Sequence, residues 1–274
     1  MSESCTHNCE SCGVGDCHDR IEKVKPNSET KIKKTIAIVS GKGGVGKTFV
    51  TSLIAAKLAK DGNKVGILDG DIVGPSIPSC FNIHQSAYGN EQKHIVPAST
   101  KSGIKIISSN LLLEHEEDPI IWRGGLVSSL LKQFYTDVAW GELEYLLIDM
   151  PPGTSDVTLT TFQSIPLDGI IIVTSPQDLV SLIVKKAINM AKMMNIPILG
   201  VIENMSYVLC PKCDEHIEIY GKSGLDEFAK ETGLKPLAKL PIRQEVVKLI
   251  DGGDAEKIVD LMPEINEVIK LLEK

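Results

Sequence analysis

Residues 41 to 48 read Gly41-Lys42-Gly43-Gly44-Val45-Gly46-Lys47-Thr48, which fits the pattern G-x-x-x-x-G-K-T. The stretch follows the apolar run 35–40, which has the composition of a buried strand. It precedes residues 48–60, where apolar residues recur at helical spacing. A strand, a glycine-rich loop and a helix in this order form the context in which the pattern binds nucleotide phosphates. The stretch therefore predicts a phosphate-binding loop in an α/β fold.

The residue types in this loop suit phosphate binding for separate reasons. Glycines allow backbone N–H groups to curl around phosphate oxygens, and the start of the following helix adds a partial positive charge. We expect Lys47 to reach the β- and γ-phosphates of ATP and Thr48 to supply its hydroxyl to Mg²⁺. Lys42 is a second lysine inside the loop, although one lysine already serves the phosphates.

Short apolar runs and helix-period stretches alternate along the rest of the chain. Continuous apolar strands that alternate with helices predict a mostly parallel sheet with helices on both faces. The expected strands are 35–40, 64–68, 104–108, 145–149, 169–174 and 198–202, and the clearest helices are 48–60, 179–194 and 225–232. The last twenty residues, 255–274, also carry apolar residues at helical spacing and predict a helix packed on the domain.

Length and composition limit the domain organisation. The chain has 274 residues, a formal charge of −7 and seven cysteines. Residues 1–34 hold few large apolar side chains, so we expect a cysteine-bearing arm and a flexible linker, followed by one ATPase domain over residues 35–274. The acidic balance argues against a nucleic-acid binder, and the apolar runs are far too short to cross a membrane. We therefore expect a cytoplasmic protein.

Carboxylates follow two of the expected strands. Asp69 and Asp71 end the second strand, and Asp149 ends the run 145–149. Ligands of open parallel sheets bind at these strand ends. A Mg²⁺ ion bound to phosphate and threonine needs carboxylates nearby, and an attacking water needs an acceptor to orient it.

The predicted ATPase domain contains one cysteine pair and one single cysteine. Cys210-Pro211-Lys212-Cys213 is a C-x-x-C pair in a polar segment, and two thiolates are half of a tetrahedral four-cysteine site. A twofold dimer would complete such a site with two cysteines from each chain. Four thiolates suit both zinc and an iron-sulfur cluster, and a redox dithiol is a further alternative. Cys80 has no spaced partner and is expected to be buried.

The loop 41–48 resembles the deviant P-loop of the family that includes MinD, ParA and the nitrogenase iron protein. In that family the early lysine, here Lys42, reaches the phosphates of a partner subunit in a nucleotide-sandwich dimer. Residues 35–255 more closely resemble the Mrp (ApbC) family of iron-sulfur cluster carrier ATPases. The motifs that carry this resemblance are Cys210-Pro211-Lys212-Cys213, Asp71-Ile72-Val73-Gly74-Pro75-Ser76-Ile77-Pro78, Trp122-Arg123-Gly124-Gly125 and Pro151-Pro152-Gly153-Thr154.

This resemblance implies roles for individual residues. Asp71 would orient the attacking water, and Asp69 and Asp149 would lie near the Mg²⁺ ion. The N–H of Gly153 would sense the γ-phosphate. Asn204 would hydrogen-bond the adenine edge, and residues 240–243 would close the other side of the base.

The resemblance also implies a function. A homodimer would hold a [4Fe-4S] cluster between the Cys210 and Cys213 pairs of two subunits, hydrolyse ATP and transfer the cluster to apo-proteins. Two alternatives remain open. One is a positioning ATPase like MinD or ParA with structural zinc-binding cysteines, and the other is a cluster-bearing ATP-dependent reductase.

The first seventeen residues contain Cys5, Cys9, Cys12 and Cys17 in the spacing C-x₃-C-x₂-C-x₄-C. This arm is similar to the four-cysteine arm of the eukaryotic cytosolic scaffold proteins, which have a longer first spacing. It predicts a second iron-sulfur cluster. A zinc site that includes His7 or His18 and a disordered thiol tail are the alternatives.

Overall fold

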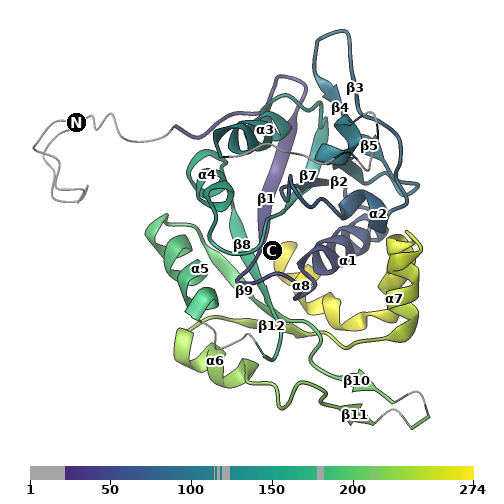
Figure 1. Ribbon diagram of the computed structural model, residues 1–274, viewed down its shortest axis with the longest axis vertical. Helices are drawn as coiled ribbons and strands as arrows, with labels where there is room; N and C mark the ends of the chain where they lie inside the picture. Colours follow the sequence, from purple (N-terminus) through teal and green to yellow (C-terminus); the bar gives the residue numbers. More distant parts are fainter. Residues whose placement is uncertain are drawn as a thin grey trace, which may run out of the picture.

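The computed structural model describes residues 22–113, 115, 118, 124–177, 182–210, 212–213 and 215–274, and within them an eight-stranded sheet runs through the centre (Figure 1). The strand order is β12-β9-β8-β1-β7-β2-β6-β5, and every neighbouring pair is parallel except β5 and β6. The strands are β1 (Lys31–Ser40), β2 (Val65–Asp69), β5 (Ala98–Ser99), β6 (Lys105–Ile107), β7 (Glu142–Asp149), β8 (Gly169–Thr174), β9 (Ile198–Glu203) and β12 (Pro236–Lys239).

Helices cover both faces of this sheet, and two small antiparallel ribbons extend from it (Figure 1). The helices are α1 (Lys47–Lys60), α2 (Ile77–Cys80), α3 (Gly125–Thr136), α4 (Asp156–Ser164), α5 (Leu182–Met193), α6 (Leu225–Thr232), α7 (Gln244–Asp251) and α8 (Asn266–Leu272), with 3-10 turns η1 (Ser109–Leu112), η2 (Ala255–Leu261) and η3 (Pro263–Ile265). The ribbons pair β3 (Tyr88–Gly89) with β4 (Ile95–Val96), and β10 (Val208–Leu209) with β11 (His216–Ile217).

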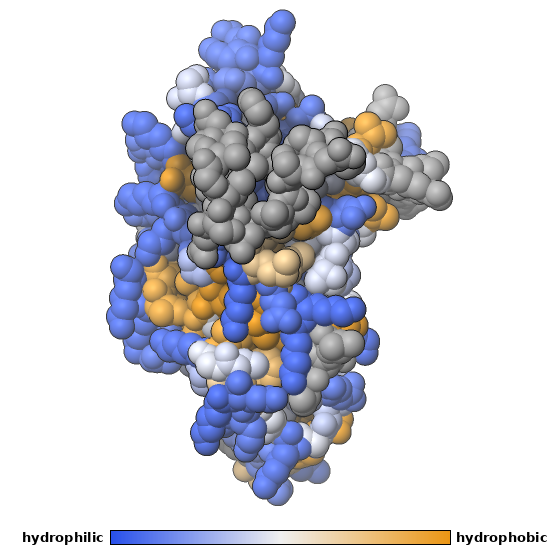
Figure 2. Space-filling view, turned by 90° about the vertical axis from the view of Figure 1, so that its left-hand side faces the viewer, coloured by the Kyte–Doolittle hydropathy of each residue, from blue (hydrophilic) through white to orange (hydrophobic). Residues whose placement is uncertain are grey.

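The two faces of the sheet have separate hydrophobic cores because side chains alternate along a strand. In β1, Ile36 and Ile38 pack into the core with α1, α7 and α8, whereas Ala37 and Val39 pack into the core with α3, α4 and α5. The sequence prediction of a mostly parallel sheet covered on both faces is therefore confirmed. The side of the molecule with α3 to α6 shows hydrophilic side chains over much of its surface and a hydrophobic area near its middle (Figure 2).

Several elements differ from the sequence expectation. The predicted helix over 255–274 is wrong as one element: η2 ends at Leu261, before Pro263 interrupts the helical hydrogen bonds, and η3 and α8 follow. Its apolar side chains are nevertheless buried, among them Ile258, Ile265 and Ile269. Strands β5 and β12 were not predicted, since they have only two and four residues and no long apolar run.

The folded part of the chain begins before residue 35. Strand β1 starts at Lys31, and its N-terminal part pairs with β7 through Lys31 and Glu142. The preceding segment is also attached, since the Val24 N–H donates to the Ser164 carbonyl at 2.8 Å and Asn27 Nδ2 donates to the Val138 carbonyl at 2.7 Å. Residues 22–34 are therefore hydrogen-bonded to the domain, contrary to the expected flexible linker. Among the described residues, no helix combines the length and hydropathy needed to span a bilayer.

Candidate functional site

The glycine-rich loop lies at the carboxyl edge of the sheet, between β1 and α1. Strands β2 and β7 end at the same edge, and Asp69 and Asp149 are paired directly across these neighbouring parallel strands. The topology thus brings together a loop and two carboxylates that lie far apart in the sequence. This is the edge at which open parallel sheets bind ligands.

Gly46 fixes the shape of the loop where it enters α1. Its φ of 77° lies in the left-handed region, and an added Cβ would lie 2.2 Å from Asn204 Nδ2. Asn204 is itself buried, and its Nδ2 donates to the Val45 carbonyl at 3.0 Å. Both the backbone conformation and the space available therefore require glycine at position 46.

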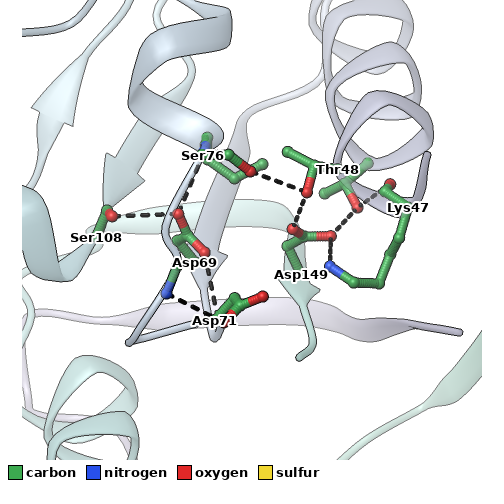
Figure 3. A network of polar contacts seen from close by, with 10 residues as sticks. Lys47, Thr48, Asp69, Asp71, Ser76, Ser108 and Asp149 are labelled. Atoms are coloured by element: carbon green, nitrogen blue, oxygen red, sulfur yellow. Dashed lines mark hydrogen bonds and ion pairs between the residues drawn. The ribbon is translucent and has the colours of Figure 1, made fainter. Parts of the chain in front are cut away.

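Lys47 and Thr48 both turn toward Asp149 at the end of β7 (Figure 3). The Lys47 ammonium lies 2.7 Å from Asp149 Oδ1, and the Thr48 hydroxyl donates to Asp149 Oδ2 at 2.8 Å. Thr51, one helical turn after Lys47, donates to Asp149 Oδ1 at 2.7 Å. The hydroxyl of Ser76 in turn donates to Thr48 Oγ1 at 3.1 Å. Asp149 is therefore held by three side chains of α1.

Asp69 lies beside this group and is fully buried. Its Oδ2 accepts hydrogen bonds from Ser108 Oγ at 3.1 Å and from the Ile77 N–H at 3.2 Å (Figure 3). Burial, and then the negative charge of Asp149, raises the pKa of Asp69 to about 7. Ionisation of this buried carboxyl is therefore unfavourable unless a cation lies nearby.

A cavity of about 220 Å³ opens above the loop. Lys42, Lys47, Asp71 and Pro152 line it together with the loop glycines. Asp71 Oδ1 accepts the Gly74 N–H at 3.3 Å, and burial raises the pKa of the Asp71 carboxyl. The predicted phosphate-binding residues and the predicted water-orienting residue therefore share one cavity.

Gly153 also lies beside the loop. Its φ is 81°, and its N–H donates to the Ser40 carbonyl at 2.8 Å, at the end of β1. A Cβ on Gly153 would lie 3.8 Å from the Gly41 carbonyl oxygen. The segment after β7 is thus hydrogen-bonded to the strand that leads into the phosphate loop.

A second cavity of about 220 Å³ lies on the other side of Gly46, which lines both cavities. It is largely apolar, and its lining includes Phe49, Asn204, Ile242 and Arg243. Asn204 and residues 241–243 of the segment expected to contact a base lie together here, whereas Leu240 does not line the cavity. Its further lining residues, among them Phe49 of α1 and Val246 of α7, were not predicted, because an apolar residue on a helix that packs against a sheet gives no signal of a ligand.

The cysteine pair lies on a separate element. Cys210 and Cys213 occupy the tip of the β10–β11 ribbon, which projects from the body of the domain (Figure 1). Cys210 is half-buried and Cys213 is exposed, whereas Cys80 is buried as predicted. Among the residues that the structure describes, no three His, Cys, Asp or Glu side chains are grouped so as to hold a metal ion.

Some predicted features lie outside the described residues. They are Cys5, Cys9, Cys12 and Cys17 of the arm, the dipeptide Trp122-Arg123, and Pro211 of the cysteine motif. Other site residues were missed by the sequence analysis, namely Thr51, Ser76 and Ser108. Thr51 carried a usable signal, since its spacing of four residues from Lys47 puts both on one face of a helix, and Ser76 lies within the quoted motif 71–78.

Comparisons with known proteins show which chains are similar to this one. The model of the ParA family, described as NUBPL iron-transfer P-loop NTPase, matches residues 31–273. An iron-sulfur cluster carrier protein of Clostridium perfringens is 45% identical over 252 residues, 89% of this chain and 88% of the relative. Another, from Methanocaldococcus jannaschii, is 45% identical over 265 residues, 93% of this chain and 91% of the relative.

Two solved structures are also similar to this chain. A nucleotide-binding protein from Archaeoglobus fulgidus, solved in complex with ADP, has a TM-score of 0.74 and 40% identity, with 82% of this chain and 88% of that chain covered. The MinC:MinD cell division complex of Aquifex aeolicus has a TM-score of 0.61 at 19% identity, with 88% of this chain and 94% of that chain covered. The second similarity concerns the fold alone.

Proposed function

The chain belongs to the ParA family of NUBPL-type iron-transfer P-loop NTPases, and from this premise we propose that it is an ATP-hydrolysing iron-sulfur cluster carrier. One observation carries the proposal. A phosphate-loop site with two adjoining cavities and an exposed C-x-x-C pair occur on the same domain, on separate elements. The first is suited to a nucleotide and the second to a soft metal centre.

ATP would occupy the two cavities that meet at Gly46. The phosphates would lie against the loop N–H groups and Lys47, and the base would lie against Asn204 and the segment 241–243. The Asn204 amide already donates to the loop at Val45, so its carbonyl oxygen would serve the base edge. We propose that this second cavity is specific for adenine.

Mg²⁺ fits the polar groups beside the phosphate cavity. The Thr48 hydroxyl and the Asp149 carboxylate are hard oxygen donors of the kind that Mg²⁺ prefers, and the Asp69 carboxyl lies on the neighbouring strand. When bound, Mg²⁺ neutralises charge on the phosphate oxygens. The buried Asp69 and Asp149 pair gives a physical reason for a cation there, because two adjacent carboxylates repel each other.

The hydrolytic step would rely on residues of the phosphate cavity. Asp71 lines that cavity and would accept a hydrogen bond from the attacking water. Lys42 would reach the phosphates bound to a partner subunit, so that charge stabilisation depends on dimerisation. The Gly153 N–H, which now bonds Ser40, would exchange that carbonyl for a γ-phosphate oxygen.

The cluster is the cargo. Two thiolates from Cys210 and Cys213 supply half of the four ligands that a [4Fe-4S] cluster needs, so a homodimer would complete the set. Reduced thiols in a cytoplasmic setting suit this role. Apo-proteins that need clusters would be the clients, and the arm cysteines 5, 9, 12 and 17 would hold a second cluster. Zinc competes for the same ligands.

Anaerobic reconstitution tests the bridging site. We expect Cys213→Ala to lose the iron and sulfide that wild type binds at the bridging site, while Cys80→Ala keeps them. The four arm cysteines should be replaced by alanine in all three proteins, so that only the bridging cluster is counted. Equal iron and sulfide in the Cys213 variant and in wild type would refute the bridging site.

The role of Lys42 is tested separately. Lys42→Ala should hydrolyse ATP at least about a hundredfold more slowly than wild type, since loss of one charge-stabilising donor typically has an effect of this size. Lys101→Ala, a change at an exposed turn lysine, is the control. Full ATPase activity of Lys42→Ala would rule out the trans-acting role.

A further inference from the structure

The wall of the apolar cavity and the root of the cysteine ribbon are joined by backbone hydrogen bonds. The Ser206 N–H donates to the Leu240 carbonyl at 3.0 Å, and the Ile242 N–H donates to the Tyr207 carbonyl at 2.8 Å. Val208, the first residue of β10, forms a parallel bridge with Ile242. Residues 241–243 line the cavity, so a movement of this wall acts directly on the chain that enters the ribbon.

Side chains extend the same connection. Arg243 lines the cavity, and its Nη2 lies 2.7 Å from Glu264 Oε1. Both side chains are largely buried, with 28% and 19% of their surface exposed. The Glu264 carboxylate also lies close to Tyr207, whose pKa is raised first by burial and then by that negative charge. Arg243, Glu264 and Tyr207 thus form a contiguous group between the cavity and the ribbon.

Tyr207 then contacts the ribbon itself. Its ring stacks on the His216 ring of β11, with ring centres 4.2 Å apart and planes inclined by 6°. His216 pairs with Leu209 across the ribbon, and the Cys210 N–H donates to the Glu215 carbonyl at 2.9 Å. The stack therefore joins the chain entering the cysteine turn to the strand leaving it.

From this arrangement we infer that Tyr207 is a positioning residue, which transmits occupancy of the apolar cavity from Arg243 and Glu264 to the orientation of Cys210 and Cys213. The inference rests on the proposed function, in which that cavity holds the base of ATP. A base packed against Arg243 would act on the ion pair and on the wall 241–243. Both are connected to Tyr207, so the two cysteines would respond to the base in addition to the phosphates.

The experiment uses the full chain, cluster-free and reduced, under anaerobic conditions. The rate of maleimide addition to Cys213 is measured by peptide-resolved mass spectrometry, with and without saturating magnesium ADP. We expect ADP to change the Cys213 rate in wild type by about fivefold or more, the lower range of coupling between sites. Magnesium pyrophosphate, which occupies only the phosphate cavity, should change it by less than about twofold, below that coupling range.

Three variants locate the connection. Tyr207→Leu removes the ring and should reduce the ADP response to less than about twofold, below the usual coupling range, while ADP affinity stays within about threefold of wild type. Tyr207→Phe keeps the ring stack and should restore the response. Tyr220→Leu, the same change at an exposed tyrosine after β11, should respond like wild type. If Tyr207→Leu does not fold, His216→Leu removes the same stack from its exposed side and decides the question.

An undiminished response in the variant that lacks the stack would overturn the inference. So would an unresponsive Cys213 in wild type, or a pyrophosphate response equal to that of ADP. The carrier proposal fails on a different measurement. If reconstitution yields no bridging cluster while Cys213 still responds to ADP through Tyr207, the carrier function is wrong and the connection stands.

Discussion

Lys47 and Asp149 form an ion pair at the base of the phosphate cavity, with 2.7 Å between Nζ and Oδ1 and side-chain exposures of 8% and 1%. Neither charge is well hydrated, so each depends on the other and on the hydroxyls of Thr48 and Thr51. The pair connects the first residue of α1 with the last residue of β7. Bound phosphate would give the same lysine a second anionic partner.

Removing one member of this pair should destabilise the nucleotide-free protein. Lys47→Met leaves the Asp149 carboxylate buried without its counter-charge, which typically costs about 3–5 kcal/mol of unfolding free energy. The control is Lys33→Met, which breaks the Lys33–Glu144 pair, exposed by 74% and 33%. That change should cost less than about 1 kcal/mol. Urea unfolding measures both, and equal losses would contradict the assignment.

Gly46→Ala should destabilise the protein more than the same change at another left-handed glycine. Alanine at position 46 meets both the φ of 77° and the buried Asn204 amide, 2.2 Å from the new Cβ. Gly62→Ala is the matched control, because its φ is 92° and no atom lies within 4 Å. We expect about 1 kcal/mol of loss at position 62, from backbone strain alone, and at least about twice that at position 46. If urea unfolding gave similar losses of unfolding free energy for the two variants, the Asn204 amide would move aside at no cost.

The raised pKa of Asp69 predicts a pH dependence of stability. The native carboxyl, with a pKa of about 7, binds a proton more tightly than the unfolded carboxyl, whose pKa is near the ordinary value of 3.8. The native state therefore binds more protons between these values, so the contribution of Asp69 to stability falls as pH rises from about 4 to 7.

Asp69→Asn tests the direction of this pH dependence. Its amide oxygen can still accept from Ser108 and Ile77, and only the longer bond from the Asp71 N–H, 3.3 Å from Oδ1, is lost, at a cost that does not depend on pH. In the presence of EDTA and without nucleotide, the variant should gain stability over wild type at pH 8, on the order of 1 kcal/mol or more. The gain should shrink toward pH 4. Thermal unfolding at several pH values gives the comparison, and a gain that is constant across pH would contradict the assigned pKa.

Thiol reactivity should separate Cys80 from Cys213. Burial raises the pKa of the Cys80 thiol to about 11, so little thiolate is present at pH 8, whereas Cys213 is exposed. We expect maleimide to modify Cys213 at least about a hundredfold faster than Cys80, since both thiolate fraction and access favour it. Unfolding in guanidinium should abolish the difference. Comparable rates in the native protein would mean that α2 opens readily.

The phosphate loop was predictable because the groups that bind phosphate belong to consecutive residues. Gly41 to Thr48 carry the backbone freedom, the lysine and the hydroxyl within one strand-loop-helix unit. The strands that follow were predictable for a similar reason, since full burial on both faces demands continuous apolar runs. The helix expected over 255–274 was wrong, because apolar spacing persists through Pro263 while the α-helical hydrogen bonds cannot.

By itself, the sequence determined the long buried strands, the strand-loop-helix unit of the phosphate loop and the residue types that can bind phosphate and soft metals, because these depend on neighbours along the chain. Only the tertiary structure decided that Asp69 faces Asp149, that Gly46 meets Asn204, and that the cavity wall at Ile242 bonds the root of the cysteine ribbon at Tyr207. Each of these contacts joins strands or loops that are distant in sequence. Strand order, and not spacing along the chain, brings them to one edge of the sheet.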